Sequence, residues 1–243
     1  MAHQASSAPE NYFGISDPRA LDEIAGELAA LRLFELEHGE PLTTFTRADL
    51  CWVHRYLLQD IYPWAGQIRT VEVGAMGMPM CRAQFVDQEL DRVMRDIARR
   101  TPPASGAEEF RNTSHAGDAT NLLRAVSTVA DHWCELTLVH PFRDGNSRTQ
   151  RFFFDQLLRS AGWGVDWTAI DANEVHAARY VGAATADSSF LAEVLLPGVA
   201  PMDEIAAGTL AVTAGERKPR AAADIFRAMM AHKRAYPGQP WNK

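Results

Sequence analysis

Long apolar runs and cysteine are both scarce in this chain of 243 residues. No stretch of about 18 consecutive apolar residues occurs, which excludes a membrane-spanning helix of ordinary length. Residues 1–14 contain no apolar segment of the kind found in secretion signals. The three cysteines, Cys51, Cys81 and Cys134, are far apart in the sequence and form no CxxC pair. We therefore expect a reduced, cytoplasmic protein without a membrane segment, and secretion into a host cell stays open as an alternative.

An excess of basic charge is also missing, because 24 Lys and Arg residues stand against 31 Asp and Glu residues. A general nucleic-acid binder needs a basic face, so we expect no direct binding of nucleic acids. The charge is unevenly placed, since Glu216–Lys243 holds seven of the 24 basic residues and two of the 31 acidic ones. This basic tail is consistent with a solvated helix, or with a segment that docks on a partner or on an acidic patch of its own domain.

Apolar residues recur at helical spacing through most of the sequence, and a hydrophobic content of 47% is enough to bury a core. Helices are predicted to begin at Asp17-Pro18 and at Thr46. The other predicted helices span residues 85–99, 121–137, 147–159, 171–183, 188–196 and 218–236. Residues 101–117 are predicted to form a connector or a short helix with loops. These patterns favour an all-α fold.

One segment favours a β-hairpin instead. Residues 67–73, Q-I-R-T-V-E-V, alternate in character and are rich in β-branched side chains. Gly74, Gly77 and Pro79 predict a turn, and Met80–Phe85 is the expected partner strand. Because a lone hairpin is only marginally stable, we expect a small flap that rests on the helices.

The chemistry is concentrated in the segment from Leu138 to Arg151, L-V-H-P-F-R-D-G-N-S-R-T-Q-R. A buried helix is predicted to end before it and a new helix to begin near Ser147, with Asn146 as its expected N-cap. The first turn of a helix presents backbone N–H groups and a positive dipole, which together form an anion site. Gly145 has no Cβ, so a phosphate can approach the backbone closely.

The side chains of this segment suit phosphate chemistry. Arg148 and Arg151 are three residues apart, so we expect both to reach a phosphate above the helix N-terminus. Asp144 offers the oxygen ligands that Mg²⁺ prefers, and His140 can act as a base near neutral pH. Phe142 is expected to pack the loop onto the core. These residues are the components of a phosphoryl- or nucleotidyl-transfer site.

The segment H-P-F-R-D-G-N-S-R-T-Q-R closely resembles the motif of the Fic/Doc family, His-x-Phe-x-Asp/Glu-Gly-Asn-Gly/Lys-Arg-x-x-Arg. Trp133 lies on the helix that precedes the motif, and Y-P-W-A-G-Q-I-R-T, from Tyr62, is similar to the family's segment that leads into its flap. The resemblance covers roughly residues 20–200. It implies a Fic-type helical bundle with one β-hairpin flap over residues 16–200, a flexible N-terminal arm over residues 1–15, and a C-terminal helical extension over residues 201–243.

By this resemblance the chain is a protein adenylyltransferase, which transfers AMP from ATP to a Ser, Thr or Tyr hydroxyl of a target protein. His140 is then the catalytic base and Asp144 the ligand of Mg²⁺. The resemblance further implies a nucleotide site formed by Phe142, Gly145, Asn146, Ser147, Arg148 and Arg151. Within it, Gly145 and Asn146 provide the anion hole, and the two arginines hold the β- and γ-phosphates. The flap, near Arg69–Phe85, is expected to align the target by strand addition.

Two departures from the family pattern have consequences. Ser147 stands where Gly or Lys is usual, which argues mildly against a kinase-like variant that carries lysine. The inhibitory pattern Ser/Thr-x-x-x-Glu-Gly/Asn is absent, and the nearest match, Ser189 to Glu193, is followed by Val194. The resemblance then implies a toxin that is inhibited by a small antitoxin-like partner, or an enzyme without such inhibition.

Two other function classes stay open. One is a Fic enzyme that transfers a different group, such as UMP, phosphate or phosphocholine. The other is a catalytically silent Fic fold that acts as a binding module, against which the complete motif argues. The remaining histidines considered, His54, His115, His132 and His176, are expected to be structural or solvent-facing, and no HExxH motif suggests a zinc hydrolase.

Overall fold

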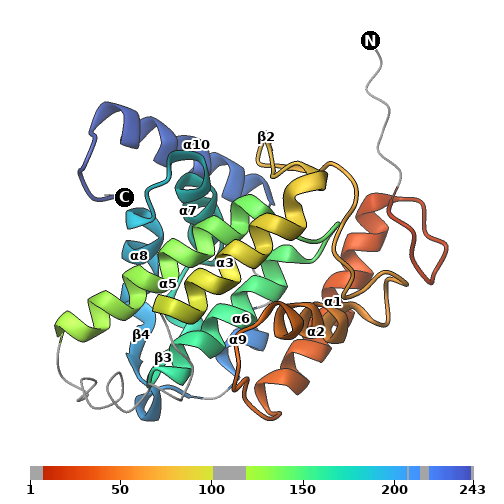
Figure 1. Ribbon diagram of the computed structural model, residues 1–243, viewed down its shortest axis with the longest axis horizontal. Helices are drawn as coiled ribbons and strands as arrows, with labels where there is room; N and C mark the ends of the chain where they lie inside the picture. The colour runs from red at the N-terminus through yellow and green to blue at the C-terminus, as the bar shows by residue number, and fades with distance from the viewer. Residues whose placement is uncertain (1–7, 101–118, 207, 214–218, 242–243) are drawn as a thin grey trace.

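A computed structural model describes residues 8–100, 119–206, 208–213 and 219–241 and has a predominantly helical fold (Figure 1). The predicted connector at 101–117, with His115, lies outside the described residues. The helices are α1 (Pro18–Glu37), α2 (Arg47–Leu58), α3 (Val86–Arg100), α5 (Ala119–Val139), α6 (Asn146–Ser160), α7 (Ala172–Thr185), α8 (Ser189–Leu195), α9 (Thr209–Val212) and α10 (Pro219–Ala235). Each helix predicted over the described residues is present, so the prediction of a helical fold is confirmed.

The starts of the first two helices follow from their capping residues. The side chain of Asp17 accepts a hydrogen bond from Arg19 N, and Pro18 occupies the first helical position. At α2, Thr46 and Asp49 form a reciprocal capping box, in which each side chain accepts from the backbone N–H of the other residue. Both motifs satisfy N–H groups that have no partner within the helix, which fixes where each helix begins.

The core is built around α5, which packs against α3, α6, α7 and α8. Its apolar stripe is fully buried at Val126, Ala130 and Leu136. Trp133 lies between two aromatic neighbours, stacked on Phe154 at 5.3 Å between ring centroids and edge-on to Trp167 at 6.4 Å. Packing on several sides fixes the end of α5, from which the motif loop departs.

The hairpin exists, but the structure corrects its position. The paired strands are β1 (Gly74–Ala75) and β2 (Met78–Pro79), joined by Met76 and Gly77 with φ values of 53° and 76°. Two successive positive φ angles are typical of the tight turn of a two-residue hairpin. Residues 67–73 do not form the predicted strand, because this arm bonds to the motif loop through Arg69 N and Pro141 O at 2.9 Å.

A second pair of strands was not predicted. β3 (Trp163–Val165) pairs antiparallel with β4 (Val199–Pro201), and short 3-10 helices lie at Ala83–Phe85, Trp167–Ala169, Leu196–Gly198 and Met202–Glu204. Each of these strands has three residues, which is too few for a periodic pattern to identify. The pair joins the segment after α6 to the segment after α8.

The C-terminal segment docks on its own domain. Helix α10 packs against α7, and Lys233 forms an ion pair with Asp187 at 2.7 Å while its ammonium lies 4.1 Å from the centroid of the Phe190 ring. Beyond the helix, Trp241 N donates to the Glu193 carboxylate at 2.7 Å. One basic side chain of the tail, Lys233, therefore pairs with an acidic side chain of the same chain, and the Trp241 backbone binds a second acidic side chain.

The N-terminal arm is also attached where it is described. Tyr12 N donates to Ile61 O at 2.9 Å, and the indole of Trp64 donates to Glu10 O at 3.0 Å. The segment around Ile61–Trp64 thus supplies hydrogen-bond partners to the described part of the arm, residues 8–15. Residues 1–7 lie outside the described residues.

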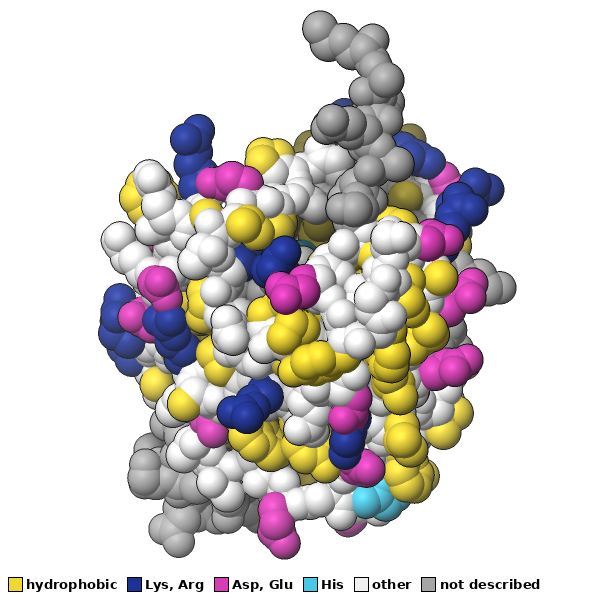
Figure 2. All heavy atoms as spheres, turned by 90° about the vertical axis from the view of Figure 1, so that its right-hand side faces the viewer, with side chains coloured by type: hydrophobic (Ala, Val, Ile, Leu, Met, Phe, Trp, Pro, Cys, Tyr) yellow, Lys and Arg dark blue, Asp and Glu magenta, His cyan; other side chains and the backbone are white. Residues whose placement is uncertain are grey.

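Figure 2 views the side of the molecule that carries α1 and α2. Acidic and basic side chains are interspersed there with apolar ones, and the exposed apolar residues of these two helices include Leu31, Phe34 and Trp52. Arg32 lies among acidic partners, with Asp60 at 2.7 Å and Glu35 at 2.9 Å. In the parts of the chain that the structure describes, no helix has both the length and the apolar character needed to cross a membrane.

Candidate active site

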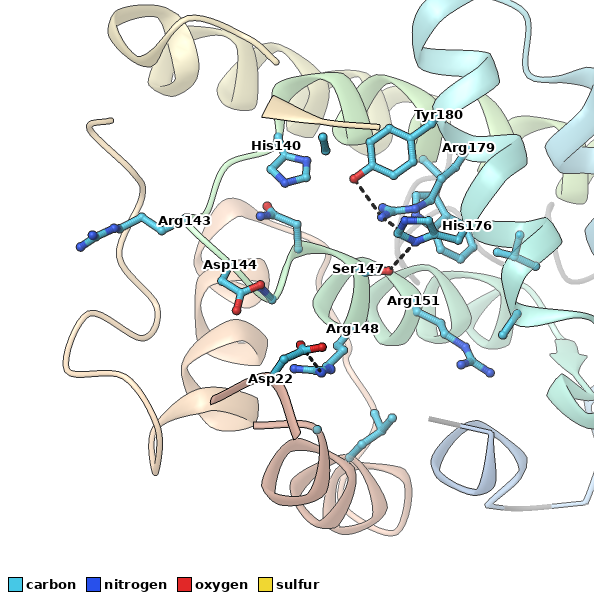
Figure 3. Close-up of a pocket in the computed structure, with 18 of the residues that line it drawn as sticks. Asp22, His140, Arg143, Asp144, Ser147, Arg148, Arg151, His176, Arg179 and Tyr180 are labelled. Carbon is cyan, nitrogen blue, oxygen red and sulfur yellow. Dashed lines mark hydrogen bonds and ion pairs between the residues drawn. The ribbon is translucent and has the colours of Figure 1, made fainter. Parts of the chain in front are cut away.

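A cavity of about 570 Å³ is bounded by α1, the flap, the motif loop, and the N-terminal parts of α6 and α7. Seven of the eight predicted site residues line it: His140, Asp144, Gly145, Asn146, Ser147, Arg148 and Arg151 (Figure 3). Its volume lies within the range of roughly 300–1,000 Å³ that is typical of small-ligand sites. The predicted residues therefore meet at one cavity large enough for a nucleotide.

His140 follows directly after the last residue of α5 and has a φ of 50°, in the left-handed region. Pro141 disfavours the right-handed helical conformation for the residue before it, so the helix ends here. A left-handed backbone costs a non-glycine residue about 1–2 kcal/mol. Arg69 Nε donates to the carbonyl of His140 at 2.6 Å, and a hydrogen bond from a charged donor contributes about 1.5–3 kcal/mol. This single contact is enough to offset the cost.

The imidazole of His140 is largely enclosed. Its Nδ1 is buried, which leaves Nε2 as the ring nitrogen available to the cavity. The pKa of His140 is lowered to about 4, first by burial and then by the Arg179 cation, against the opposing effects of the Thr137 carbonyl and Asp144. The ring is therefore neutral at neutral pH and able to accept a proton. A bound polyphosphate would raise this pKa toward the range that suits a general base.

Asp144 is exposed, and its carboxylate is oriented by two donors. The Tyr62 hydroxyl donates to Oδ2 at 2.8 Å and Gly145 N donates to Oδ1 at 2.7 Å. Tyr62 is itself fixed by stacking on Trp64, with ring centroids 4.2 Å apart. Burial, together with the Asp144 charge, raises the pKa of Tyr62, so its hydroxyl stays protonated and keeps donating. The remaining lone pairs of Asp144 are free to meet a ligand or a cation.

His54 supports the same loop from α2, and its structural role agrees with the expectation. Gly66 N donates to Nδ1 at 2.7 Å, so Nε2 carries the proton and donates to the carbonyl of Asp144 at 3.0 Å. Burial lowers the pKa of His54 to about 4, which keeps this neutral tautomer. The ring stacks on Phe142 with centroids 3.8 Å apart.

Phe142 is the one predicted nucleotide-site residue that does not line the cavity. Its side chain is fully buried behind the loop, against His54. An aromatic ring gains more from apolar burial here than from contact with a polar phosphate site. Phe142 therefore packs the loop onto the core, as the physical interpretation of the sequence proposed, and it does not touch the cavity as the resemblance implied.

The beginning of α6 differs in one detail from the prediction. Gly145, with a φ of 74°, is the N-cap, and Asn146 is the first helical residue. The Asn146 amide is engaged with the backbone of Phe142, accepting from its N–H at 3.0 Å and donating to its carbonyl at 2.8 Å. A Cβ on Gly145 would lie 2.2 Å from Leu58 Cδ1, so glycine is required for both conformation and space. Asn146 thus closes the loop around the helix N-terminus.

The two motif arginines do not converge. Arg148 points toward α1, where Asp22 lies 3.9 Å away, whereas Arg151 points away from His140 (Figure 3). The Arg151 guanidinium lies 4.3 Å from the Trp167 ring centroid and donates to the side-chain hydroxyl and the carbonyl of Thr213. Of the two motif arginines, Arg148 is therefore the one that lies beside an acidic side chain of α1, whereas the Arg151 guanidinium is engaged with Thr213 and Trp167.

Helix α7 contributes cavity residues that the sequence analysis missed or misassigned. His176, Arg179 and Tyr180 line the cavity, and His176 is buried there. The Ser147 hydroxyl lies 3.3 Å from His176 Nδ1, and Arg179 donates to Gln150 Oε1 at 2.8 Å. Spacings of three and four residues place these α7 side chains on one helix face, which is a signal that was present in the sequence.

Within the described ranges, no group of three or more His, Cys, Asp or Glu side chains could enclose a metal ion. A single carboxylate can still hold Mg²⁺ when phosphate oxygens and waters complete the octahedron. Asp144 fits that arrangement, because its carboxylate is exposed at the cavity, oriented by Tyr62, and adjacent to the α6 N-terminus.

Comparison with known proteins shows similarity over most of the chain. The profile of the Fic/DOC family matches residues 44–158. The probable protein adenylyltransferase Fic of Salmonella typhimurium is 32% identical over 160 residues, which cover 66% of this chain and 72% of the relative. The Escherichia coli protein of the same description is 31% identical over 175 residues, which cover 71% of this chain and 78% of the relative.

Solved structures support the same fold at lower sequence identity. The BepC protein of Bartonella tribocorum, with bound AMPPNP, has a TM-score of 0.65 at 20% identity and covers 82% of this chain and 96% of that protein. The N-terminal Fic domain of a VirB-translocated effector of Bartonella quintana, with bound ADP, has a TM-score of 0.66 at 20% identity. This match covers 83% of this chain and 95% of that protein.

Proposed function

This chain belongs to the Fic/DOC family, and on that premise we propose that it transfers AMP from ATP to a Ser, Thr or Tyr hydroxyl of a target protein. One observation carries the proposal: a neutral His140 and an exposed Asp144 share a single cavity with the N-terminus of α6. The base and the anion site that nucleotidyl transfer needs are therefore within one ligand's length of each other.

The proposed reaction begins with the triphosphate at the α6 N-terminus, where first-turn N–H groups and the helix dipole favour negative charge. Nε2 of His140 accepts the proton of the target hydroxyl, whose oxygen attacks the α-phosphorus. A new P–O bond forms to the target, the bond between the α-phosphorus and the bridging oxygen breaks, and pyrophosphate leaves. The proton stays on His140 until the imidazole returns it to solvent.

Asp144 is proposed to hold a Mg²⁺ ion that neutralises phosphate charge when the nucleotide is bound. Arg148 is proposed to hold the β- or γ-phosphate. Because Arg151 now contacts Thr213 and Trp167, its proposed role at the phosphates requires a change of side-chain rotamer. Asn146 acts by keeping the anion hole in shape through Phe142.

The target is proposed to dock on the flap, whose strands β1 and β2 lie at the cavity, where Gly74 and Ala75 form part of the lining. We further propose that a small antitoxin-like partner inhibits the enzyme. Glu193, in the nearest match to the inhibitory pattern, accepts a hydrogen bond from Trp241 N and is not part of the cavity lining. Inhibition by this glutamate in cis therefore has no support in the geometry.

The test is incubation with α-³²P-ATP, Mg²⁺ and cell lysate, followed by mass spectrometry of any labelled protein. We expect a mass increase that corresponds to AMP on a hydroxyl side chain. Parallel reactions with UTP and with γ-labelled ATP distinguish transfer of UMP or phosphate. If label appears only in those reactions, the chain transfers UMP or phosphate and the proposal of AMP transfer is wrong. The proposed inhibitor is tested separately, by co-expressing the chain with small proteins encoded next to it and measuring whether AMP transfer stops.

A further inference from the structure

Arg69 holds an unusual position for a charged side chain. It is 2% exposed, and among the described residues its hydrogen bonds run to backbone carbonyls alone. A buried guanidinium is costly unless its donors are satisfied, and satisfied donors confer strict geometry. A residue in this position therefore contributes chiefly by fixing the segments whose carbonyls it binds.

The four carbonyls belong to two different parts of the molecule. Val71 O, at 2.7 Å from Nη1, and Cys81 O, at 2.5 Å from Nη2, lie on the two arms of the flap. His140 O, at 2.6 Å from Nε, and Val139 O, at 3.2 Å from Nη2, lie at the end of α5. One side chain thus joins both arms of the flap to the backbone of the proposed base.

Backbone hydrogen bonds also join the arms of the flap to the segment around His140. Arg69 N donates to Pro141 O at 2.9 Å, and Cys81 N donates to Leu138 O at 3.0 Å. These bonds flank His140 on both sides in the sequence. Beyond them, the flap is tied together by β1–β2 and by Met80 N to Val73 O at 3.2 Å. The flap and the loop therefore form one hydrogen-bonded unit, with the Arg69 guanidinium inside it.

We propose that Arg69 is a positioning residue that couples the flap to His140, so that a target docked on the flap presents its hydroxyl to the imidazole in a fixed register. This inference rests on the proposed function. Arg69 does not line the cavity, so it acts through the backbone of His140 and the flap and does not touch the substrate. Its replacement should therefore impair the transfer step and target docking more than nucleotide binding.

The test compares Arg69→Met and Arg69→Lys with the wild type and with Arg159→Met. Arg159 is a matched control, since it is a largely buried arginine with a carboxylate partner, Asp155 at 2.7 Å, at the far end of α6. Arg69→Lys keeps the charge but loses the planar fork, and it serves as the second variant if Arg69→Met fails to fold. For each variant we measure steady-state kinetics with the protein that is labelled in the lysate assay. The Kd for ATP is measured by direct titration, and the melting temperature by thermal denaturation.

Both Arg69 variants should lose about 100-fold in kcat, the usual effect of misplacing a catalytic group by about 1 Å, and should show a raised KM for the target. The Kd for ATP should stay within about threefold of the wild type, and Arg159→Met should match the wild type in all three constants. A folded Arg69 variant that keeps wild-type kcat and target KM would overturn the proposal.

Readouts independent of transfer separate this inference from the proposed function. Amide exchange at Met80 and Cys81 should accelerate in both Arg69 variants, and an NMR titration should show a raised pKa for His140 in Arg69→Met but not in Arg69→Lys. The Arg179 cation and Asp144 also face this imidazole and are unchanged in both variants. Wild-type protein that fails to transfer AMP would reject the proposed function alone, whereas unchanged exchange and an unchanged His140 pKa would reject the role of Arg69.

Discussion

The base side of the cavity, formed by His140 and Asp144, is held by short, partly buried hydrogen bonds, whereas on the phosphate side, formed by Arg148 and Arg151, Arg148 has a longer ion pair with an exposed carboxylate. Arg69 fixes the His140 backbone at 2.6 Å, and Tyr62 fixes the Asp144 carboxylate at 2.8 Å. Among the described residues, Arg148 has one ion pair, at 3.9 Å, with the exposed Asp22. The proposed base is therefore preorganised, whereas the proposed phosphate role requires Arg151 to leave its contacts with Thr213 and Trp167.

The largest expected effect comes from removing the base itself. His140→Ala should lower the rate of AMP transfer by about 10³-fold, in the middle of the range for general bases, because it removes the proposed acceptor of the hydroxyl proton. ATP affinity should change little, since the imidazole is not a phosphate ligand in the proposed site. Transfer assays measure the rate, and calorimetric titration measures the ATP affinity. Undiminished transfer by His140→Ala would show that another group is the base.

The next effect concerns pH, because the buried histidines on the base side resist protonation. The pKa values of His54 and His140 are lowered to about 4 in the folded chain, chiefly by burial, against about 6.5 when unfolded. As the pH falls from about 6.5 to 4, these two histidines bind protons in the unfolded state but stay neutral in the folded state. The free energy of unfolding should drop by on the order of 1–2 kcal/mol for each such histidine.

Urea denaturation at pH 7.5 and pH 5 measures this drop. The His140→Ala variant is the internal control, because it should lose a smaller part of its stability over the same interval. A flat profile in the wild type would mean that these rings are charged or open to solvent.

A smaller effect is expected from the hydroxyl that orients Asp144. Tyr62→Phe keeps the stacking on Trp64 but removes the hydrogen bond to Oδ2. A hydrogen bond to a charged group contributes about 1.5–3 kcal/mol at most. Its loss should raise the Mg²⁺ concentration needed for half-maximal activity by roughly tenfold. A titration of activity with Mg²⁺ measures this concentration. An identical Mg²⁺ curve in Tyr62→Phe and the wild type would contradict the proposal that Asp144 holds the cation.

The smallest effect is expected on the phosphate side, and it should be a gain in ATP affinity where the earlier predictions are losses of function or stability. Asp22→Asn removes the carboxylate that faces Arg148, so ATP should bind more tightly. Exposed ion pairs contribute about 0–1 kcal/mol, which limits the gain to roughly fivefold. Calorimetric titration of the variant with ATP measures the gain, and Glu35→Gln, on the same helix but outside the cavity lining, is the matched control. Weaker ATP binding by Asp22→Asn would show that the carboxylate helps the nucleotide.

The local parts of this site were predictable from the sequence. His140, Asp144, Gly145 and the helix that follows lie within one short segment, and their spacing, together with capping and backbone rules, predicts a loop at a helix N-terminus. The N-cap was assigned one residue late, to Asn146, because asparagine is the commoner capping side chain. The amide of Asn146 instead binds the Phe142 backbone, a choice that depends on the folded loop.

The parts that escaped prediction depend on contacts between distant segments. The α7 residues that line the cavity belong to a separate helix after the motif. Their spacing places them on one helix face, but the sequence does not indicate that this face turns toward the motif loop. Similarly, Q-I-R-T-V-E-V alternates as a strand would, yet its arm bonds to the motif loop, and the paired strands lie at the tip of the flap. Tertiary hydrogen bonds there override local β propensity.

The brevity of β1 and β2 limits what the flap can recognise. Each strand has two residues, so a substrate segment laid along its edge finds only a few backbone donors and acceptors and little room for side-chain selection. If the target docks on the flap as proposed, discrimination among cellular proteins depends on surfaces of the folded target far from the modified residue. Short peptides copied from the modified site should accordingly be poor substitutes for the intact protein.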